Sequence, residues 1–472
     1  MTNICHTTIF NHHSKLTGLL FLLLTTSFFI SPVQGQGQYG GGLGEKDNPY
    51  LIYTSAQMNE IGACHDDWAK HFKLMADIDL SAFTGTTFNI IGSTKTSKPF
   101  TGTFDGNNHK IINFTYHSVG KNEVGLFSYI DNNSDAEIRN LCLINPDVNA
   151  EGGTAVGVLV GFLGMGNITG CYVEDGNVSG ENMVGGLVGW DMSGSISNCH
   201  ATGEVSGDFY VGGLAGLVLS ANIYDSYSRG GVSGTNAVGG LAGGANPVNC
   251  YSISDVSGVT RVGGLVGYGN AVGCYSAGSV SGSTIVGGLV GSEGAVNSYS
   301  LSSVSGDDRV GGLIGEKLTS ITNCYSAGYV LGTTNVGGLV GYNNSGSSVN
   351  SSFWDTETSS QNNSDGGVGM ATSQMRMKST FSSVGWDFTT PLWAICEGTN
   401  YPRLAWEQKQ AADFVCPDGV AMTDFAFLAA HWLRDNCEAL NGYCEGCDLN
   451  RSGAVDFTDL RLFVDQWLTG IR

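Results

Sequence analysis

The chain has 472 residues, 71 of them glycine, with only 13% charged residues and a formal net charge of −21. This composition favours a turn-rich β protein of two or three domains. The scarcity of Lys and Arg makes nucleic acid and anionic membranes poor partners and disfavours acidic polysaccharides.

Residues 1–35 have the pattern of a signal peptide. Lys15 precedes the apolar run LTGLLFLLLTTSFFI, and small residues follow near Val33 and Gly35. The run is too short to span a bilayer comfortably, so we expect cleavage near Gly35, with an uncleaved anchor as the alternative. No later segment is long and apolar enough for a transmembrane helix. The mature chain is therefore expected to be secreted and to fold where disulfides persist.

Residues 36–99 are expected to form an N-terminal cap and the first strands. The stretch NPYLIYTSAQMNEIG predicts a strand and then a short amphipathic helix with Met58 and Ile61 on one face. Further on, FTGTFDGNNHKIINF alternates apolar residues around a turn, as first coils of a β-helix would. The cap would cover a sheet edge that otherwise pairs with other chains.

Residues 100–354 contain a repeat of 24 to 28 residues. Each unit opens on a valine, and these are Val156, Val184, Val211, Val238, Val262, Val286, Val310 and Val336. A unit carries three short β-type pieces, for example VGGLVG, AVGCYS and GSVSG, with Gly, Ser and Asn turn signals between them. Three strands and three turns per unit predict a parallel β-helix, a solenoid in which eight stacked coils bury a core that one coil cannot.

Stacking turns two columns of the repeat into ladders. One column is Cys171, Cys199, Ser226, Cys250, Cys274, Ser298 and Cys324, and the next is Tyr172, His200, Tyr227, Tyr251, Tyr275, Tyr299 and Tyr325. Because neighbours in a strand point to opposite faces, one column is internal. Val272 shares parity with Cys274, which places Cys inside, whereas Ile196 shares parity with His200, which argues the reverse unless a bulge intervenes.

We expect the Cys column inside and the Tyr column outside. The outward rings would then either bind the apolar faces of sugar rings or only stabilise the sheet surface. The ligand-binding candidates are Tyr172, Tyr227, Tyr251, Tyr275, Tyr299 and Tyr325. Arg261 and Arg309, at equivalent positions of their units and the second beside Asp307 and Asp308, are interpreted as corner residues.

The units resemble GLUG-motif repeats, named for the GGLVG core, over roughly residues 124–354. The resemblance implies a right-handed β-helix with adhesive or carbohydrate-related roles at bacterial surfaces. It does not imply one particular activity.

Residues 355–407 are expected to cap the other end of the solenoid. The aromatic side chains Trp354, Trp386, Trp393 and Trp406 are dense around this segment. Asp355 and Glu357 form the one acidic pair considered for glycoside hydrolysis, and two solvated acids in a polar turn are the favoured interpretation.

Residues 408–472 contain the sharpest chemical signal, the stretch DLNRSGAVDFTD. Oxygen donors at loop positions 1, 3, 5, 9 and 12 with Gly at position 6 match a twelve-residue calcium loop. The predicted calcium ligands are Asp448, Asn450, Ser452, the carbonyl of Ala454, Asp456 directly or through water, and Asp459. A helix would follow with Leu460, Phe463, Val464, Trp467 and Leu468 on one face.

The same loop and helix recur thirty-five residues earlier, with Phe425, Leu428, Ala429, Trp432 and Leu433 on the helix. The earlier loop, DFVCPDGVAMTD, keeps only Asp413 and Asp424 as donors, so one calcium ion is favoured over two. The duplication resembles a type I dockerin over about residues 413–468, which implies docking to a cohesin domain. Phe457 and Met422 depart from the small hydroxyl residues of that pattern, which puts cohesin binding in doubt.

Four cysteines surround the weaker loop, namely Cys416, Cys437, Cys444 and Cys447. Their spacing suits zinc or disulfides, and a secreted chain favours disulfides. One bridge is expected to stabilise the half that lacks calcium, with its pairing left open.

The sequence therefore predicts a mainly β protein, a secreted and non-catalytic solenoid with a small helical calcium-binding tail. Its expected role is adhesion or polysaccharide association, at a cell surface or in an extracellular complex. The alternative is a polysaccharide lyase or glycoside hydrolase carried by the same tail. Lyases of this shape need a basic residue and acids in a groove, and the coils are nearly free of both.

Overall fold

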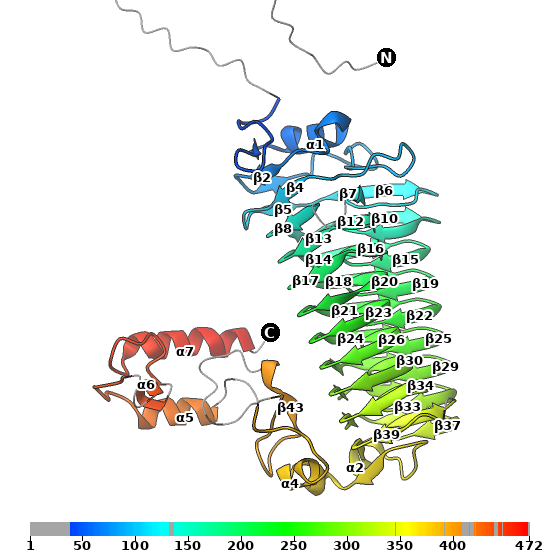
Figure 1. Ribbon diagram of the computed structural model, residues 1–472, viewed down its shortest axis with the longest axis vertical. Helices are drawn as coiled ribbons and strands as arrows, with labels where there is room; N and C mark the ends of the chain where they lie inside the picture. The colour runs from blue at the N-terminus through cyan, green and yellow to red at the C-terminus, as the bar shows by residue number, and fades with distance from the viewer. Residues whose placement is uncertain are drawn as a thin grey trace, which may run out of the picture.

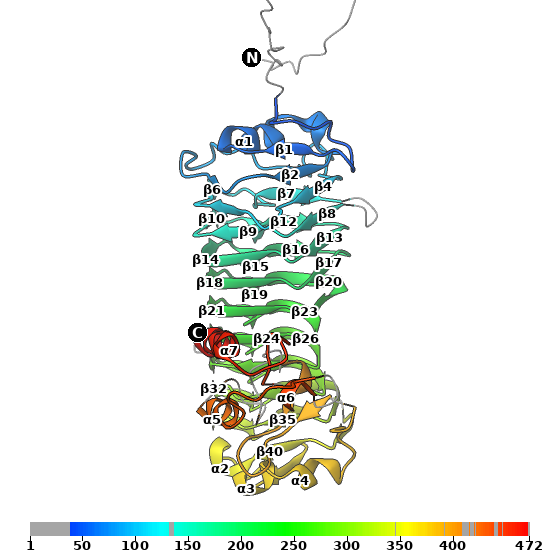
Figure 2. The same cartoon turned by 90° about the vertical axis from the view of Figure 1, so that its left-hand side faces the viewer.

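The computed structural model describes residues 38–131, 136–344, 346–390, 392–407, 415, 420, 422–438, 442–445 and 447–470. The predicted signal peptide, Asp413 and Cys416 lie outside these residues, as does the side chain of Leu468. The described part is a long stack of β-coils with one cap at each end and a helical segment beside its lower half (Figures 1 and 2).

Each coil of the stack contributes a strand to three parallel sheets, so the predicted parallel β-solenoid is confirmed. The third sheet has one strand per coil and therefore shows eight coils in register, with Val156 paired to Val184, Val184 to Val211 and so on. Its strands are β11 (Thr154–Gly157), β15 (Asn182–Gly185), β19 (Phe209–Gly212), β22 (Asn236–Gly239), β25 (Thr260–Gly263), β29 (Thr284–Gly287), β33 (Asp308–Gly311) and β37 (Thr334–Gly337).

The first sheet has sixteen strands and runs through both the N-terminal cap and the coils. Its strands are β1 (Tyr50–Ile52), β2 (Phe72–Leu74), β4 (Thr103–Asp105), β7 (Phe127–Ile130), β8 (Glu137–Arg139), β12 (Val160–Leu163), β13 (Asn167–Thr169), β16 (Val188–Asp191), β17 (Ser195–Ser197), β20 (Ala215–Tyr224), β23 (Ala242–Val248), β26 (Val266–Val272), β30 (Val290–Val296), β34 (Ile314–Thr322), β38 (Val340–Asn343) and β39 (Val349–Asn350).

The second sheet has seventeen strands and carries the Tyr column at the start of its strands. Its strands are β3 (Ile78–Asp79), β5 (Lys110–Ile112), β6 (Thr115–Val119), β9 (Cys142–Ile144), β10 (Asp147–Glu151), β14 (Tyr172–Ser179), β18 (His200–Ser206), β21 (Tyr227–Ser233), β24 (Tyr251–Ser257), β27 (Tyr275–Ala277), β28 (Ser279–Ser281), β31 (Tyr299–Ser300), β32 (Ser303–Ser305), β35 (Tyr325–Ser326), β36 (Val330–Leu331), β40 (Phe353–Asp355) and β41 (Val368–Met370).

The coil corners fall inside the pieces that the sequence presents as strands. VGGLVG is split between β25 and β26 by a corner at Gly264 and Leu265, and AVGCYS is split at Gly273 and Cys274. A Cβ on Gly264 would lie 2.0 Å from the carbonyl oxygen of Gly288 in the next coil. The second glycine of the repeat is therefore required because adjacent coils approach too closely for a side chain.

A second corner, just before the Cys column, resolves the conflict of parity. It is made by a residue in the left-handed region, which is Asn198 (φ 52°), Asn249 (φ 53°) or Gly273 (φ 61°) in different units. Asn and Gly tolerate this conformation best. The corner breaks the strict alternation of faces, so Ile196 and Cys199 are both internal although they are three positions apart.

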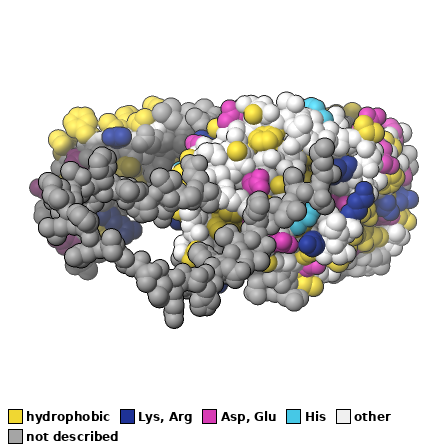
Figure 3. Space-filling model, turned by 90° about the horizontal axis from the view of Figure 1, so that it is seen from above, with side chains coloured by type: hydrophobic (Ala, Val, Ile, Leu, Met, Phe, Trp, Pro, Cys, Tyr) yellow, Lys and Arg dark blue, Asp and Glu magenta, His cyan; other side chains and the backbone are white. Residues whose placement is uncertain are grey.

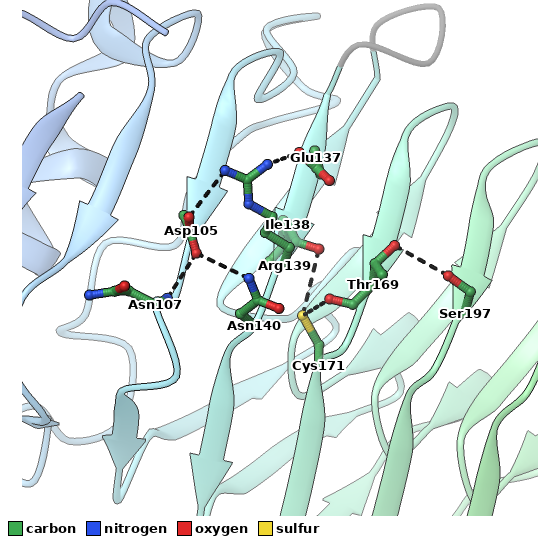
Figure 4. Close-up of polar contacts among 9 residues, drawn as sticks. All are labelled: Asp105, Asn107, Glu137, Ile138, Arg139, Asn140, Thr169, Cys171 and Ser197. Atoms are coloured by element: carbon green, nitrogen blue, oxygen red, sulfur yellow. Dashed lines mark hydrogen bonds and ion pairs between the residues drawn. The ribbon is translucent and has the colours of Figure 1, made fainter. Parts of the chain in front are cut away.

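The Cys column is internal, as we expected, but the parity argument for it was wrong. Val272 does not share a face with Cys274, because Val272 is 39% exposed and its neighbour Ala271 is buried. Each internal thiol lies against backbone carbonyls, and Cys171 Sγ is 3.6 Å from the oxygens of Ile138 and Thr169 (Figure 4).

The same close-up shows polar side-chain contacts that join neighbouring coils on their outer side. Arg139 lies 2.7 Å from Glu137 and 3.1 Å from Asp105 of the preceding coil, and Thr169 lies 3.2 Å from Ser197 of the next (Figure 4). Polar ladders of this kind tie successive coils together on the solvent side, while the apolar columns do so inside.

Caps close both ends of the apolar core. At the N-terminal end, helix α1 (Ser55–Ala63) begins with a capping box between Thr54 and Gln57 and buries Met58 and Ile61, as predicted. A short 3₁₀ helix, η1 (His65–Asp67), follows.

At the other end, the C-terminal cap forms a second cluster in which Phe381, Trp386 and Trp393 pack on Tyr299 and Tyr325 of the solenoid. Its elements are α2 (Thr356–Ser359), α3 (Thr372–Met375), α4 (Lys378–Ser382), the antiparallel pair β42 (Trp393–Ala394) and β43 (Arg403–Leu404), and the 3₁₀ helix η2 (Ala405–Glu407).

The C-terminal segment has its own small core around Leu428, Val455 and Phe463. Its helices are α5 (Met422–Ala430), α6 (Gly442–Glu445) and α7 (Phe457–Gly470). Helix α5 ends earlier than the pattern suggests. Leu433 lies beyond it with φ 60° and is 73% exposed, so the prediction that Leu433 belongs to the buried helical face is wrong.

Candidate functional site

The tyrosine ladder, Tyr172, His200, Tyr227, Tyr251, Tyr275, Tyr299 and Tyr325, runs along the outside of the second sheet. Neighbouring rings are 4.5 to 5.1 Å apart between centroids and at most 10° from parallel. Burial, with the Arg229 charge adding, lowers the pKa of His200 to about 4, so this ring is neutral at physiological pH and stacks like the tyrosines.

This geometry removes the basis for binding sugar rings on the ladder. Each ring from His200 to Tyr299 has both faces against the rings of the adjacent coils, and Tyr172, at the end, has one face against His200 and lies beside Cys142 on the other. Face-to-face contact with a sugar needs an uncovered ring face. The ladder therefore supports the alternative interpretation, stabilisation of the sheet through cross-strand contacts.

The C-terminal cap also covers the last rungs. Tyr299 is 1% exposed and Tyr325 is not exposed, so neither is available to a ligand on this surface. Trp406 lies over Tyr251 and Tyr275, at 6.3 and 5.9 Å between ring centroids, and its indole N–H donates to the Gly273 carbonyl at 3.1 Å.

Hydrogen bonds complete this docking. The Tyr299 hydroxyl donates to the Glu407 carboxylate at 2.8 Å, and the Tyr325 hydroxyl donates to the Pro402 carbonyl at 2.6 Å. Burial raises the pKa of Glu407 to about 7, although Tyr299, the Leu404 N–H and Arg403 all favour its charged form. Sequence patterns gave no signal for Glu407, because nothing local indicates that its segment returns to the ladder.

The acidic pair beside the cap has a structural role. Asp355 is not exposed, and its Oδ1 accepts the N–H groups of Glu357 and Thr358 at 2.9 and 3.0 Å, so it is the N-cap of α2. Its Oδ2 accepts the Tyr401 hydroxyl at 2.7 Å. The interpretation of both acids as solvated is wrong for Asp355.

The two basic residues interpreted as corner residues lie inside strands β25 and β33, so that interpretation is wrong. Arg261 and Arg309 have φ values of 56° and 55°, immediately before the valine that opens the repeat. Arg309 makes ion pairs with Asp308 at 3.5 Å and Glu316 at 3.0 Å.

The loop 448–459 directs its first and last carboxylates inward. Asp448 accepts the N–H groups of Ser452 and Gly453, both at 2.9 Å, and Asp459 accepts those of Asn450 at 3.1 Å and Asp456 at 2.9 Å. Asp448 is 2% exposed and Asp459 is not exposed.

The remaining predicted ligands have less regular surroundings. Asn450 Oδ1 accepts the Ser452 N–H at 2.9 Å, and the Ser452 hydroxyl donates to the Ala454 carbonyl at 3.3 Å. Asp456 caps α7 by accepting the Thr458 N–H at 2.7 Å. Among the described residues, no three His, Cys, Asp or Glu side chains gather in a metal-holding group, so a cation here would also rely on amide, hydroxyl and carbonyl oxygens.

The first loop repeats one contact of the second. The N–H of Val415, at position 3, donates to Asp424, at position 12, at 3.0 Å, as Asn450 does to Asp459. Of the four cysteines around this loop, Cys437 and Cys444 form a disulfide, and Cys447 is a buried thiol. Cys396, which the sequence did not single out, is also disulfide-bonded.

Two neighbouring cavities at the N-terminal end had no sequence signal. The larger, about 740 Å³, includes Tyr116, Ser118 and Lys121 in its lining, and the smaller, about 360 Å³, shares Tyr116 and Lys121 with it. The lining comes from strands β6, β7 and β10, from α1 and η1, and from the segment 86–96, which are separate in sequence.

No described helix is long and apolar enough to cross a bilayer.

The family model and the two protein relatives each match only part of the chain. The family model described as "The GLUG motif" matches residues 180–206. Halomucin of Haloquadratum walsbyi is 34% identical over 120 residues, which are 25% of this chain and 1% of halomucin. A protein of Evansella cellulosilytica, provisionally named as a Gly-rich membrane protein, is 36% identical over 127 residues, which are 26% of this chain and 14% of that protein. The chain thus spans a small fraction of these relatives.

Among solved structures, a Bacteroides ovatus chain provisionally assigned as an immunoglobulin A1 protease is 20% identical, with a TM-score of 0.38, and the match covers 78% of this chain and 96% of that one. We draw no functional argument from this likeness. The chain is thus a parallel β-solenoid in which the segment 180–206 matches the GLUG motif.

Proposed function

We propose that the protein is a secreted, non-catalytic scaffold that acts in adhesion or polysaccharide association and is attached through its C-terminal segment, which calcium stabilises. The observation that carries this proposal is the pair of buried carboxylates in the loop 448–459. Neither Asp448 nor Asp459 forms an ion pair with a described Lys, Arg or His, although both are almost fully buried. Buried charge without a partner is costly, so the loop calls for a cation.

The donor set fits calcium better than other cations. Calcium prefers six to eight oxygen ligands from carboxylates, carbonyls and amides, and it tolerates irregular geometry. Asp448, Asn450, Ser452, Asp459 and the Ala454 carbonyl would hold it, with Asp456 directly or through water. The ion would supply the positive charge that the two buried carboxylates lack, and so stabilise the segment.

A duplicated apolar position supports attachment to a partner. Met422 and Phe457 stand two residues before Asp424 and Asp459 and begin α5 and α7. They are 63% and 76% exposed. Large exposed apolar side chains at equivalent positions of two repeats suit protein recognition, and a cohesin-like domain is the partner that we propose. Because Phe and Met replace small hydroxyl residues, the cohesin would need an apolar surface.

An extracellular or cell-surface location is part of the proposal. The names of the relatives, halomucin and a Gly-rich membrane protein, refer to surface settings, and the chain matches each over about a quarter of its own length. A capped solenoid with eight stacked coils would hold a binding end away from the attachment end.

The proposal of a non-catalytic protein rests on where the two carboxyl groups with strongly raised pKa values lie. Burial raises the pKa of both Asp191 and Glu407 to about 7. Asp191 is internal, with Oδ1 accepting the Gly194 N–H at 2.6 Å, and Glu407 lies beneath the C-terminal cap. Neither faces a groove that could admit a glycan.

The test is a calorimetric titration of Ca²⁺ into the chelator-treated full chain, together with thermal unfolding. We expect one binding event and a stabilisation of about 2.7 kcal/mol when calcium is at 100 times its dissociation constant. Asp448→Asn and Asp459→Asn should abolish both effects. Asp435→Asn, at an exposed acid outside the loop, should preserve them. A wild-type chain without heat or stabilisation would refute the calcium proposal.

Two further experiments test attachment to a cohesin and association with polysaccharides. Binding to purified cohesin domains should require calcium and should weaken in Phe457→Ser. Incubation with a panel of polysaccharides should deplete the protein without releasing sugar ends, and release would favour the lyase or hydrolase alternative instead.

A further inference from the structure

The cavities at the N-terminal end lie where regular coiling begins. Strand β6 pairs with β10 along five residues, but on its other side it meets the irregular loop around residue 85, where the His117 N–H donates to the Gly85 carbonyl at 2.9 Å. A strand edge covered by a loop leaves space that stacked coils do not. The larger cavity, about 740 Å³, is a hollow widely open to solvent, and its volume falls in the range typical of ligand sites.

Lys121 lies at the junction of the two cavities and lines both. Its ammonium group donates to the hydroxyl of the buried Tyr116 and lies 4.8 Å from the centre of that ring. No described Asp or Glu lies within ion-pair distance of it. A half-buried cation that is held in place by an aromatic ring and lacks a carboxylate partner is suited to an anionic group of a ligand.

Ser118 supplies a second unfilled contact. Its hydroxyl is buried and has no hydrogen-bond partner among the described residues, although it lines the larger cavity. Buried hydroxyls are normally satisfied, so this one indicates a missing partner. Lys95, in the smaller cavity, adds a second ammonium group without an ion pair to a described carboxylate.

The other side of the larger cavity offers groups suited to hydroxyls. Asn149 and Glu151 project from β10 beside His117 and Val119 of β6, with which they are in register. His117 is fixed by Asp147 at 2.9 Å. An amide, a carboxylate and an imidazole together can accept from and donate to several sugar hydroxyls.

The charge of this end differs from that of the rest of the chain. Residues 36–122 contain seven lysines and eight acidic residues and so have a net charge of −1, whereas residues 140–308 contain only two basic residues, Arg229 and Arg261. Seen from above, basic side chains are visible beside acidic ones and histidine on the described surface (Figure 3). The net charge of −21 therefore does not describe this site.

We propose that the N-terminal cavities bind a carboxylated sugar, a hexuronate residue within a glycan, with the carboxylate at Lys121 and Ser118 and the hydroxyls at Asn149 and Glu151. This rests on, and deepens, the proposed association with polysaccharides. It is opposite to the expectation from overall charge that acidic polysaccharides are disfavoured, and the experiment below decides between the two.

The experiment is a calorimetric titration of the full chain, with calcium present, using tetragalacturonate as the probe. We expect saturable binding in the millimolar range or tighter, and binding at least about tenfold weaker for Lys121→Met, because one charge-assisted contact is lost. Lys98→Met is the matched control, since Lys98 is paired with Asp66 at 3.8 Å and does not line either cavity. It should bind as the wild type does.

Thermal unfolding and circular dichroism of Lys121→Met should match those of the wild type, which separates loss of the contact from misfolding. The methyl ester of the probe should bind at least about tenfold more weakly, as the neutral ester cannot pair with Lys121.

Three outcomes would overturn the proposal: equal binding by wild type and Lys121→Met, no wild-type binding, or full displacement by equimolar inorganic phosphate or sulfate, which would show a general anion site. None of these depends on calcium binding by the tail, so failure here and failure of the calcium titration are distinguishable.

Discussion

Replacing Glu407 by Gln tests how the C-terminal cap is held on the tyrosine ladder. The Glu407 side chain is 9% exposed, and its oxygens accept the Tyr299 hydroxyl at 2.9 and 2.8 Å and the Leu404 N–H at 2.8 Å. Burial raises the pKa of Glu407 from its ordinary value of 4.5 to about 7. The protonated form is therefore the one that the docked cap favours.

A rise of this size corresponds to about 3 kcal/mol. Because the folded pKa lies above the unfolded value, the docked cap binds the proton more tightly than the undocked one. Stability from this group is fully present below pH 4.5 and is lost as the pH rises through about 7. A glutamine at position 407 cannot ionise. The free energy that holds the cap docked should therefore increase in Glu407→Gln, relative to wild type, by up to about 3 kcal/mol from pH 4.5 to pH 8.

Hydrogen exchange read by mass spectrometry on peptides covering residues 393–407 measures the opening of the cap. Comparing variant and wild type at each pH cancels the intrinsic pH dependence of exchange. Glu357→Gln, at an exposed acid of the same cap, is the control and should follow wild type. If the difference between Glu407→Gln and wild type stays constant from pH 4.5 to pH 8, burial of this carboxyl does not govern docking and the reasoning is refuted.

Three other substitutions probe the coils and the tail. Gly264→Ala places a Cβ 2.0 Å from the next coil and should lower the unfolding free energy by about 3 kcal/mol in denaturant titrations. The control Gly120→Ala, at φ 63° with no atom within 4 Å, should lower it by about 1 kcal/mol. Equal losses would contradict the steric argument. Asn249→Ala should destabilise by about 1 kcal/mol in the same titrations and Asn249→Gly by less, because Asn249 has φ 53°. Replacing both Cys437 and Cys444 by Ser should lower the melting temperature of the tail by the equivalent of about 2 kcal/mol in scanning calorimetry, and an unchanged transition would show that the bridge is dispensable.

The repeat was enough to predict the coils. The valines recur at 24 to 28 residues, and the structure pairs them in adjacent strands, as between Val262 and Val286. Periodicity carries this information because parallel strands of neighbouring coils pair like with like. The buried face of α1 was equally predictable, since Met58 and Ile61 are one helical turn apart and a capping box precedes them.

The faces of individual residues were less predictable than the repeat. Strict alternation applies only while the strand continues, and the left-handed residue before each Cys interrupts it. The Cys column is internal for that reason, not because Val272 shares its face. The sequence shows Asn or Gly before each Cys, but either residue is compatible with a turn between two strands and with a single left-handed residue that changes the direction of the chain.

The surfaces were decided by tertiary structure alone. Whether Tyr275 and Tyr299 face solvent depends on Trp406 and Glu407, residues more than a hundred positions away in the chain. The cavities beside Lys121 exist because a loop and not a strand covers the edge of β6.

The sequence by itself thus determined the solenoid, its register, the N-terminal helix and the position of the oxygen-rich loop, because each is written in local spacing. Only the tertiary structure decided that the tyrosine rings pack their faces on one another, that Cys437 pairs with Cys444, and that Lys121 and Ser118 share one cavity. Each of these depends on the distance between residues in space, which side-chain packing sets and which sequence spacing does not record.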